Sequence, residues 1–286
     1  SDLSSTRATA SASLFSQTTG MVRVSAGDGE SFGGGTQQDM GTGFSVESNL
    51  RDAANVRFSG NFGHMGQAGT QSAGFRTTYT SRQSGAQVSL TARQAMMPSL
   101  AGSGTGDSSP VLRTASLSIS DHTDIDALRL DYGINLETVS YLRRVMAASP
   151  FARASYDLGS DGMLRAAFSA GTRPAQLISK DGQIDGVDYN ADLAALALLP
   201  RVSRRDRHMR MERLKAFELG WERSSGSRKF SANVYREEIA DAAFTLSGAQ
   251  GPALWTDLLP DLDSRSFVFN AGDLYRTGFE GAFTQS

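Results

Sequence analysis

The sequence predicts an all-β protein, a transmembrane antiparallel up-and-down β-barrel, and three observations lead to this fold class. Apolar and polar residues alternate along most of the chain, as they do in a β-strand. Short and long connections follow one another between the alternating segments. The chain is rich in glycine, with 30 among its 286 residues, and no segment has a convincing helical period.

The alternation is clearest in the stretch DALRLDYGINLETV, residues 126–139. Leu128, Leu130 and Tyr132 share one parity, whereas Arg129 and Asp131 share the other. A strand here therefore has one apolar and one charged face. In chain order, the same pattern predicts about thirteen strands of roughly 9 to 12 residues, the first of them faint, at residues 6–15, 22–26, 44–50, 56–62, 75–79, 88–92, 115–119, 128–136, 152–158, 164–170, 217–221, 230–234 and 275–283.

The connections between these strands alternate in length. Short turns of Gly, Ser, Asn and Asp are predicted at SQTTG, RDAA, RQSG, DHTD, GSDG and SSGS. Long connections are predicted at residues 27–42, 63–74, 94–110, 138–149, 173–211 and 241–272. Transmembrane β-barrels have this asymmetry, with tight periplasmic turns and larger extracellular loops.

A soluble β-sandwich or barrel is the alternative fold, because its strands alternate too. The apolar faces here are thin, with many Ala, Thr, Gly and Ser residues, which suits contact with lipid better than a packed core. Aromatic residues fall near the strand ends, where membrane barrels carry aromatic girdles. These residues are Phe58, Phe62, Phe75, Tyr79, Trp221 and Phe283.

Bulk composition excludes several classes of protein. The chain has no cysteine, which excludes a disulfide scaffold, thiolate metal sites and a cysteine nucleophile. Its formal net charge of -2 gives no global electrostatic case for binding nucleic acid. No segment approaches the roughly 20 apolar residues of a membrane-spanning helix. The first residues, SDLSSTRATA, lack the features of a signal peptide.

Three passages resemble barrel hairpins of TonB-dependent receptor-like outer-membrane proteins. They are SPFARASYDLGSDGMLRAAFSAGTRP (149–174), KAFELGWERSSGSRKFSANVYREEIADAAF (215–244) and GFEGAF (278–283). The resemblance implies a barrel of about 22 strands in the outer membrane of a Gram-negative cell. It also implies transport of a scarce substrate, captured by extracellular loops and admitted when an inner-membrane TonB energy-coupling complex rearranges a plug domain.

The chain departs from this family in two ways. Neither a plug nor an energy-coupling box appears in the sequence, and bacterial barrels normally close with an even number of strands. We therefore expect residues 1–286 to be a partial outer-membrane β-barrel domain, with the plug and the remaining strands outside this chain. The missing signal peptide then says nothing about location.

Two other functions fit the same strands and loops. A passive porin would have no plug and would carry a constricting loop inside its pore. A surface adhesion or assembly protein would use the barrel only as an anchor. No loop carries a motif that names a substrate.

Parity predicts which side chains line the lumen of such a barrel. The parity opposite to the apolar one carries charges of both signs, which could hydrogen-bond a plug or a polar solute. The candidates for this wall are Arg57, Arg129, Asp131, Arg153, Arg165, Glu218 and Glu222. Four basic residues instead share the apolar parity near the long connections, where they are interpreted as snorkelling strand ends or as contacts for headgroup phosphates: Arg113, Arg213, Lys215 and Arg236.

The strongest basic run is RVSRRDRHMRMER, residues 201–213. It is interpreted either as the charged rim of an extracellular loop or as a site for an anionic ligand or lipopolysaccharide phosphates. The residues of that site would be Arg204, Arg205, Arg207 and Arg210. Outer-membrane lipid, lipopolysaccharide and the TonB complex are thus the expected partners.

Catalysis finds little support in the sequence. His64, His122 and His208 are scattered over different predicted connections, with no evident serine or carboxylate partner. The acidic run at 180–192 lacks the spacing of a calcium loop. The glycine-rich runs at 31–43 and 101–110 precede no helix that could bind phosphate. We expect no enzymatic activity, no metal and no cofactor.

Overall fold

The computed structural model describes residues 15–27, 39–50, 53–65, 70–96, 111–141, 143–171, 196, 200–247, 259–261 and 266–285. Besides the short 3-10 helix η2 (Gly159–Asp161) and Leu196, which has a helical conformation, these residues form strands and the segments that join them. The strands are β1 (Phe15–Gly27), β2 (Asp39–Leu50), β3 (Ala54–Met65), β4 (Thr70–Ser81), β5 (Gln87–Met96), β6 (Val111–Ile125), β7 (Leu128–Ser140), β8 (Arg144–Asp157), β9 (Met163–Gly171), β10 (Val202–Arg205), β11 (His208–Met211), β12 (Arg213–Ser225), β13 (Arg228–Ala240), β14 (Ala243–Ser247), β15 (Leu259–Asp261), β16 (Ser266–Asn270) and β17 (Leu274–Gln285).

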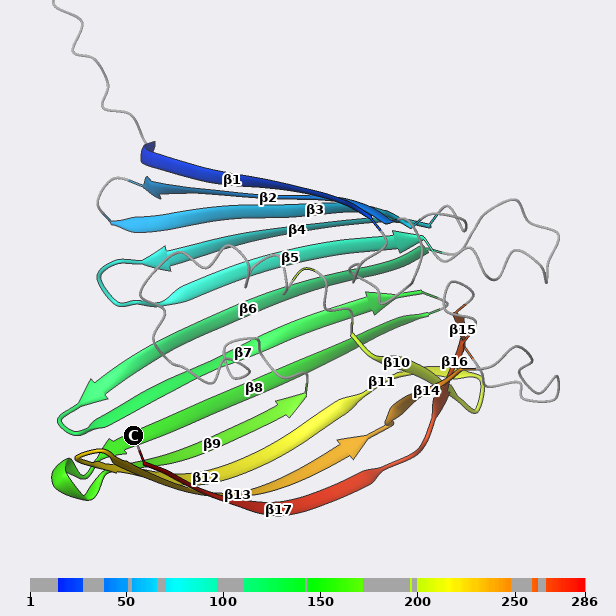
Figure 1. Cartoon of the computed structure of the whole chain (residues 1–286). Coiled ribbons are helices and arrows are strands. Elements are labelled where there is room, and N and C mark those ends of the chain that lie inside the picture. The colour runs from blue at the N-terminus through cyan, green and yellow to red at the C-terminus, as the bar shows by residue number, and fades with distance from the viewer. Residues whose placement is uncertain are drawn as a thin grey trace, which may run out of the picture.

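One antiparallel sheet of 12 strands dominates the structure, in the order β1-β2-β3-β4-β5-β6-β7-β8-β9-β12-β13-β17. Strands that are neighbours in the sheet also follow one another in the chain, except where the β10–β11 hairpin and the small β14-β16-β15 sheet intervene. Figure 1 shows a strongly curved sheet with β1 and β17 at its two edges. The predicted up-and-down arrangement is confirmed. The faint strand predicted at 6–15 lies outside the described residues apart from Phe15.

The two faces of this sheet have the reverse of the burial found in soluble proteins. Along β2, Ser45 is 0% exposed, whereas the next residue, Val46, is 40% exposed. Along β3, Ser59 is 1% exposed and Phe58 is 41% exposed. We call the two sides the polar face and the apolar face. A soluble sheet would bury its large apolar side chains, whereas a barrel in lipid turns them outward.

Aromatic rings form a packed patch on the apolar face of β2 to β4. The Phe58 ring centroid lies 5.6 Å from that of Phe44 and 6.0 Å from that of Phe75, and Phe62 meets Phe75 edge to face at 5.3 Å. Gly60 lies beneath this patch, where a Cβ atom would come within 2.6 Å of the Phe44 ring. Glycine at this position therefore lets the neighbouring rings close over the backbone.

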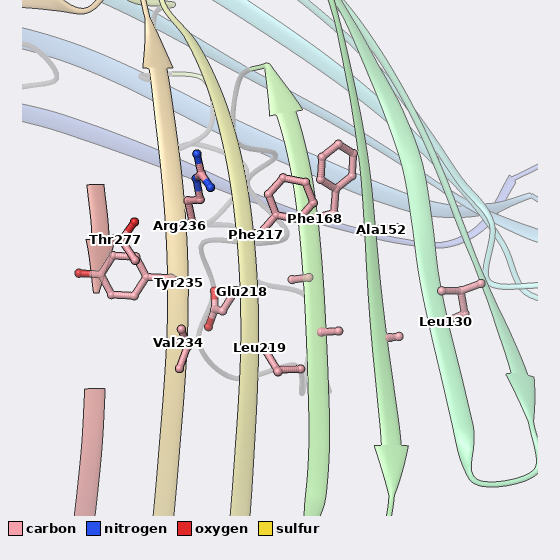
Figure 2. A pocket seen from close by; sticks show the side chains of 13 residues that line it. Leu130, Ala152, Phe168, Phe217, Glu218, Leu219, Val234, Tyr235, Arg236 and Thr277 are labelled. Carbon is pink, nitrogen blue, oxygen red and sulfur yellow. The ribbon is translucent and has the colours of Figure 1, made fainter. Parts of the chain in front are cut away.

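Further along the apolar face, a shallow groove of about 490 Å³ opens over β7 to β13 (Figure 2). Ala154 and Ala166 lie in its middle, and Leu130, Phe217 and Leu219 line it on either side. The groove exists because these alanines are short where the flanking strands carry bulky side chains. No helix in the described parts of the chain is long and apolar enough to cross a membrane.

Two of the predicted turns are wrong. SQTTG lies within β1, where a register shift between Ser16 and Thr19 marks a bulge rather than a turn. DHTD lies within β6, and the chain reverses at residues 126–127 instead. In register, His122 faces Asp131 and Asp124 faces Arg129. The opposite charges of Asp124 and Arg129 favour strand pairing over the turn that the Asp residues suggested.

The predicted long connection at 138–149 is also wrong, because β7 and β8 extend until only residues 141–143 separate them. Val139 and Val145 pair in register near this end of the sheet. Val139 is fully buried on the polar face, and Val145 packs against the same apolar cluster. Apolar side chains on this face were not expected, and their partner is the β10–β11 hairpin.

Candidate functional site

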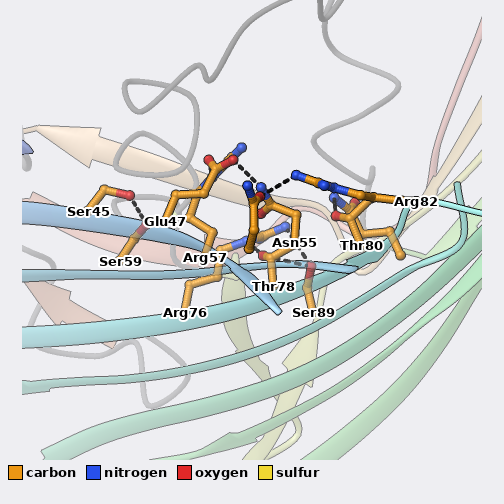
Figure 3. Close-up of polar contacts among 12 residues, drawn as sticks. Ser45, Glu47, Asn55, Arg57, Ser59, Arg76, Thr78, Thr80, Arg82 and Ser89 are labelled. Carbon is orange, nitrogen blue, oxygen red and sulfur yellow. Dashed lines mark hydrogen bonds and ion pairs between the residues drawn. The ribbon is translucent and has the colours of Figure 1, made fainter. Parts of the chain in front are cut away.

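The polar face of β2 to β4 carries a network of charged and amide side chains (Figure 3). Glu47 and Arg57 face one another in register, and Arg57 Nε donates to the Glu47 carboxylate at 2.9 Å. Asn55 donates to the same carboxylate, and Arg82 from the β4–β5 turn donates to Asn49. The network satisfies each charge with a directional partner, which fixes these side chains along the wall.

Small hydroxyl residues form a second part of the network. Ser45 and Ser59 share a hydrogen bond of 2.7 Å, and Thr78 and Ser89 share one of 3.1 Å. Arg76 extends across them and donates to both Thr78 and Ser89 at 3.3 Å. All four hydroxyl residues are buried. In this part of the polar face, the buried hydroxyl groups therefore have hydrogen-bond partners within the protein.

The polar face of β9, β12, β13 and β17 is charged as well. Glu222 accepts from Lys229 at 2.8 Å and lies 3.7 Å from Arg165. Glu237 pairs with Arg276 at 2.7 Å. These mixed-sign pairs offer donors and acceptors to a polar surface or to water, and they form no arrangement of nucleophile and base.

The structure places all seven predicted wall residues on the polar face, and most of them form a hydrogen bond or an ion pair there. The partners of Arg57, Arg165 and Glu222 are given above. Arg129 donates to Asp131 at 3.2 Å, and Glu218 accepts from Asn233 at 2.8 Å. Arg153 faces Asp131 in register. Whether they line a pore stays a prediction.

Sequence reasoning missed several members of these networks. Most of them share the parity of the predicted wall residues, so a complete reading of that parity would have found them. Arg82 lies in a turn, where parity gives no signal. The missed residues are Glu47, Arg76, Arg82, Lys229, Glu237 and Arg276.

The β10–β11 hairpin packs against the polar face at the end of the sheet that carries the long connections. Met209 and Met211 are buried against Leu112 of β6 and Val139 of β7. Tyr141 packs against the same cluster. We call this contact the hairpin anchor. It holds a basic segment over one end of the polar face by apolar packing.

The four predicted arginines of this hairpin are not gathered on one side. Arg204 faces Met209 in register, so it shares the side of the hairpin that packs on the wall. Arg205 and Arg210 alternate to the other side, and Arg207 lies in the turn. The hairpin offers positive charge on both sides and at its tip. A role in binding an anion stays a prediction.

A polar contact holds the other side of the hairpin. Asn270 of β16 donates to Ser203 Oγ at 2.9 Å and to Asp241 Oδ1 at 3.1 Å. At the base of the hairpin, Glu212 accepts from the backbone N–H of Ala243 at 2.9 Å. The hairpin is thus fixed between the wall and the small β14-β16-β15 sheet.

Comparison with known proteins places this fold. A family model described as "TonB dependent receptor-like, beta-barrel" matches residues 2–286. The chain belongs to this family. A comparison with curated proteins finds no match.

This chain, called the receptor barrel below after its family, also resembles a solved structure, the FrpB iron transporter from Neisseria meningitidis (F5-1 variant) in its apoprotein form. The two chains share 13% sequence identity with a TM-score of 0.53. The match covers 87% of the receptor barrel and 42% of the FrpB chain, so this chain spans less than half of that transporter. At this identity the likeness concerns the fold alone.

The histidines of the receptor barrel lie in strands, which corrects their expected place in connections. His64 is in β3, His122 is in β6 and His208 begins β11. Among the residues that the structure describes, no three His, Asp or Glu side chains are grouped so that they could hold a metal ion.

Burial in the hairpin anchor raises the pKa of Tyr141 above its ordinary value of about 10. The folded state then holds the phenolic proton to higher pH than the unfolded chain does. Stability is therefore unchanged below about pH 10 and falls as the pH rises through the folded pKa. An ultraviolet titration of the wild type minus that of Tyr141→Phe should show a phenol that ionises late. Ionisation at the ordinary value would contradict burial of Tyr141.

Proposed function

We propose that the receptor barrel forms part of the wall of an outer-membrane transporter of a Gram-negative cell, opened by the TonB energy-coupling complex. One observation carries the proposal: the sheet exposes large apolar side chains on one face and carries its charged and hydroxyl side chains, several of them buried, on the other. Such a surface is stable where lipid covers the apolar face. Family membership supports the coupling to TonB.

In this proposal the polar face is the lumen wall. Its paired charges, such as Glu47 with Arg57 and Glu237 with Arg276, leave no large field of one sign. A wall of this kind can hydrogen-bond a plug domain in several registers and release it without exposing an unpaired charge. The seven predicted wall residues would contact the plug or the passing solute.

The long connections would face the outside and capture the substrate. The β10–β11 hairpin belongs to them, and its anchor places it over the end of the polar face. We propose that Arg204, Arg205, Arg207 and Arg210 attract an anionic substrate there. The plug and further strands of the transporter would come from outside residues 1–286.

A specific observation favours the passive porin as a second candidate. Leu196, between β9 and β12, is buried, and its side chain lies 3.3 Å from where a Cβ atom of Gly74 would be on the polar face of β4. The constricting loop of a porin would likewise reach from between two strands to the wall of the lumen. The porin reading requires no plug and no energy coupling.

Conductance separates the two candidates. Full-length protein in planar lipid bilayers is expected to stay closed if a plug fills the lumen, whereas a porin gives stable open steps. Uptake of a nutrient panel should then be compared in cells with and without a working TonB complex. We expect uptake of at least one nutrient to disappear without the complex. Open conductance steps, together with uptake that does not depend on the complex, would refute TonB-dependent transport in favour of the porin. No uptake in either strain would favour a barrel that serves only as an anchor.

A further inference from the structure

We propose that the groove on the apolar face over β7 to β13 is a binding site for lipopolysaccharide, with an acyl chain in the groove and a headgroup phosphate on Arg236. The site is independent of whether transport is active or passive. It depends only on the apolar face being in contact with the membrane.

The shape of the groove favours one acyl chain. Its volume of about 490 Å³ falls within the roughly 300 to 1,000 Å³ of small-molecule sites. Ala152, Ala154 and Ala166 leave the space, and Phe168 and Phe217 narrow it, their ring centroids 4.9 Å apart (Figure 2). Acyl chains elsewhere in a bilayer are already in apolar surroundings, so selectivity must come from filling this shape and from the charge beside it.

Arg236 supplies that charge. It lines the groove from β13, faces Phe217 in register and is exposed on the apolar face. With the residues that the structure describes, its side chain makes no hydrogen bond or ion pair. An arginine that faces lipid is unfavourable unless it reaches a headgroup or a counter-charge. A phosphate at the end of the groove would satisfy it with charge-assisted hydrogen bonds.

The surrounding charges favour lipopolysaccharide over a phospholipid with one phosphate. Arg236 lies toward the end of β13 that leads into a long connection, and two more exposed basic residues, Lys215 and Arg213 of β12, lie on the same face beside that end of β13. Glu238, paired with Lys215 at 3.7 Å, is an acidic residue among them. Three cations within this one hairpin match a headgroup with several phosphates.

Lipid titration followed by native mass spectrometry tests the site in full-length protein in detergent micelles. The probes are diphosphoryl lipid A, monophosphoryl lipid A and phosphatidylglycerol. Arg236→Gln removes the charge, and Ala166→Leu fills the groove while the charge stays. We expect each variant to weaken binding of diphosphoryl lipid A about tenfold. Arg236→Gln loses a charged hydrogen bond to the phosphate, and Ala166→Leu blocks the space for the acyl chain.

Two matched variants serve as controls. Arg228→Gln removes an arginine from the same face of β13 at its other end, and Ala232→Leu enlarges an exposed alanine of β13 that does not line the groove. Both should bind lipid A as the wild type does. Equal binding by Arg236→Gln or by Ala166→Leu would overturn the site. Phosphatidylglycerol bound as tightly as diphosphoryl lipid A would overturn the assignment to lipopolysaccharide.

Discussion

Replacing Met211 with serine is expected to make the β10–β11 hairpin about a hundredfold more susceptible to trypsin. Met211 is 4% exposed and packs with Leu112 and Val139 in the hairpin anchor. Removing a buried Met side chain costs about 3 kcal/mol. When cleavage follows opening of the hairpin, that loss raises the open population, and with it the cleavage rate, by about two powers of ten. Four arginines lie in or beside the turn, so an undocked hairpin offers several cleavage sites.

The measurement is the rate of cleavage between Arg204 and Arg210 in protein folded into lipid vesicles. Met146→Ser is the matched control, because Met146 lies on the apolar face and is 71% exposed. It should be cut at the wild-type rate. If Met211→Ser and the wild type were cut equally fast, the hairpin would not be held by its apolar contact. Melting of the sheet, recorded in parallel, distinguishes release of the hairpin from global unfolding.

Gly162→Ala is expected to destabilise the receptor barrel by about 4 kcal/mol, through backbone strain and overlap together. Gly162 ends the β8–β9 turn with a φ of 101°, which side chains rarely adopt. A Cβ atom there would overlap the backbone carbonyl oxygen of Glu222 and lie 3.0 Å from Arg223 Cα. Neither contact is with the flexible end of a side chain, so β12 itself would have to move.

Gly159 in the same turn provides the control. It also has a positive φ, 65°, but nothing lies within 4 Å of a Cβ atom at that position. Gly159→Ala should therefore lose only about 1 kcal/mol, the left-handed backbone term alone. Urea unfolding in vesicles, followed by tryptophan fluorescence, measures both. Equal losses for the two variants would show that the overlap with β12 is relieved at no energetic expense.

Much of the sheet could be predicted from the sequence, because a period of two needs only neighbouring residues. Arg57 and Phe58 alternate in the sequence, and their places on opposite faces follow from that alone. The partner of Arg57 does not follow. Glu47 meets it only because the β2–β3 turn fixes the register, and turn length is the feature that composition predicts least well.

The hairpin anchor could not be predicted for a different reason. The turn between β10 and β11 places Asp206 and Arg207 at φ of 52° and 63°, without the glycine that signals such turns. The many basic residues of 201–213 indicate a solvated loop, although Met209 and Met211 alternate with them. An apolar patch on an otherwise polar wall is a tertiary property, visible only when β6, β7 and β8 are brought together.

The order of strands in the sheet also has a consequence for assembly of the receptor barrel. Most pairs join strands that are close in the chain, such as β6 and β7 across residues 126–127, so the sheet can grow hairpin by hairpin from local contacts. Pairing β9 with β12 must close residues 172–212, which adds roughly 2 to 3 kcal/mol of chain entropy before any ladder forms. Insertion is therefore expected to proceed quickly through β9 and to pause there, with the unpaired edge of β9 exposed until β12 arrives.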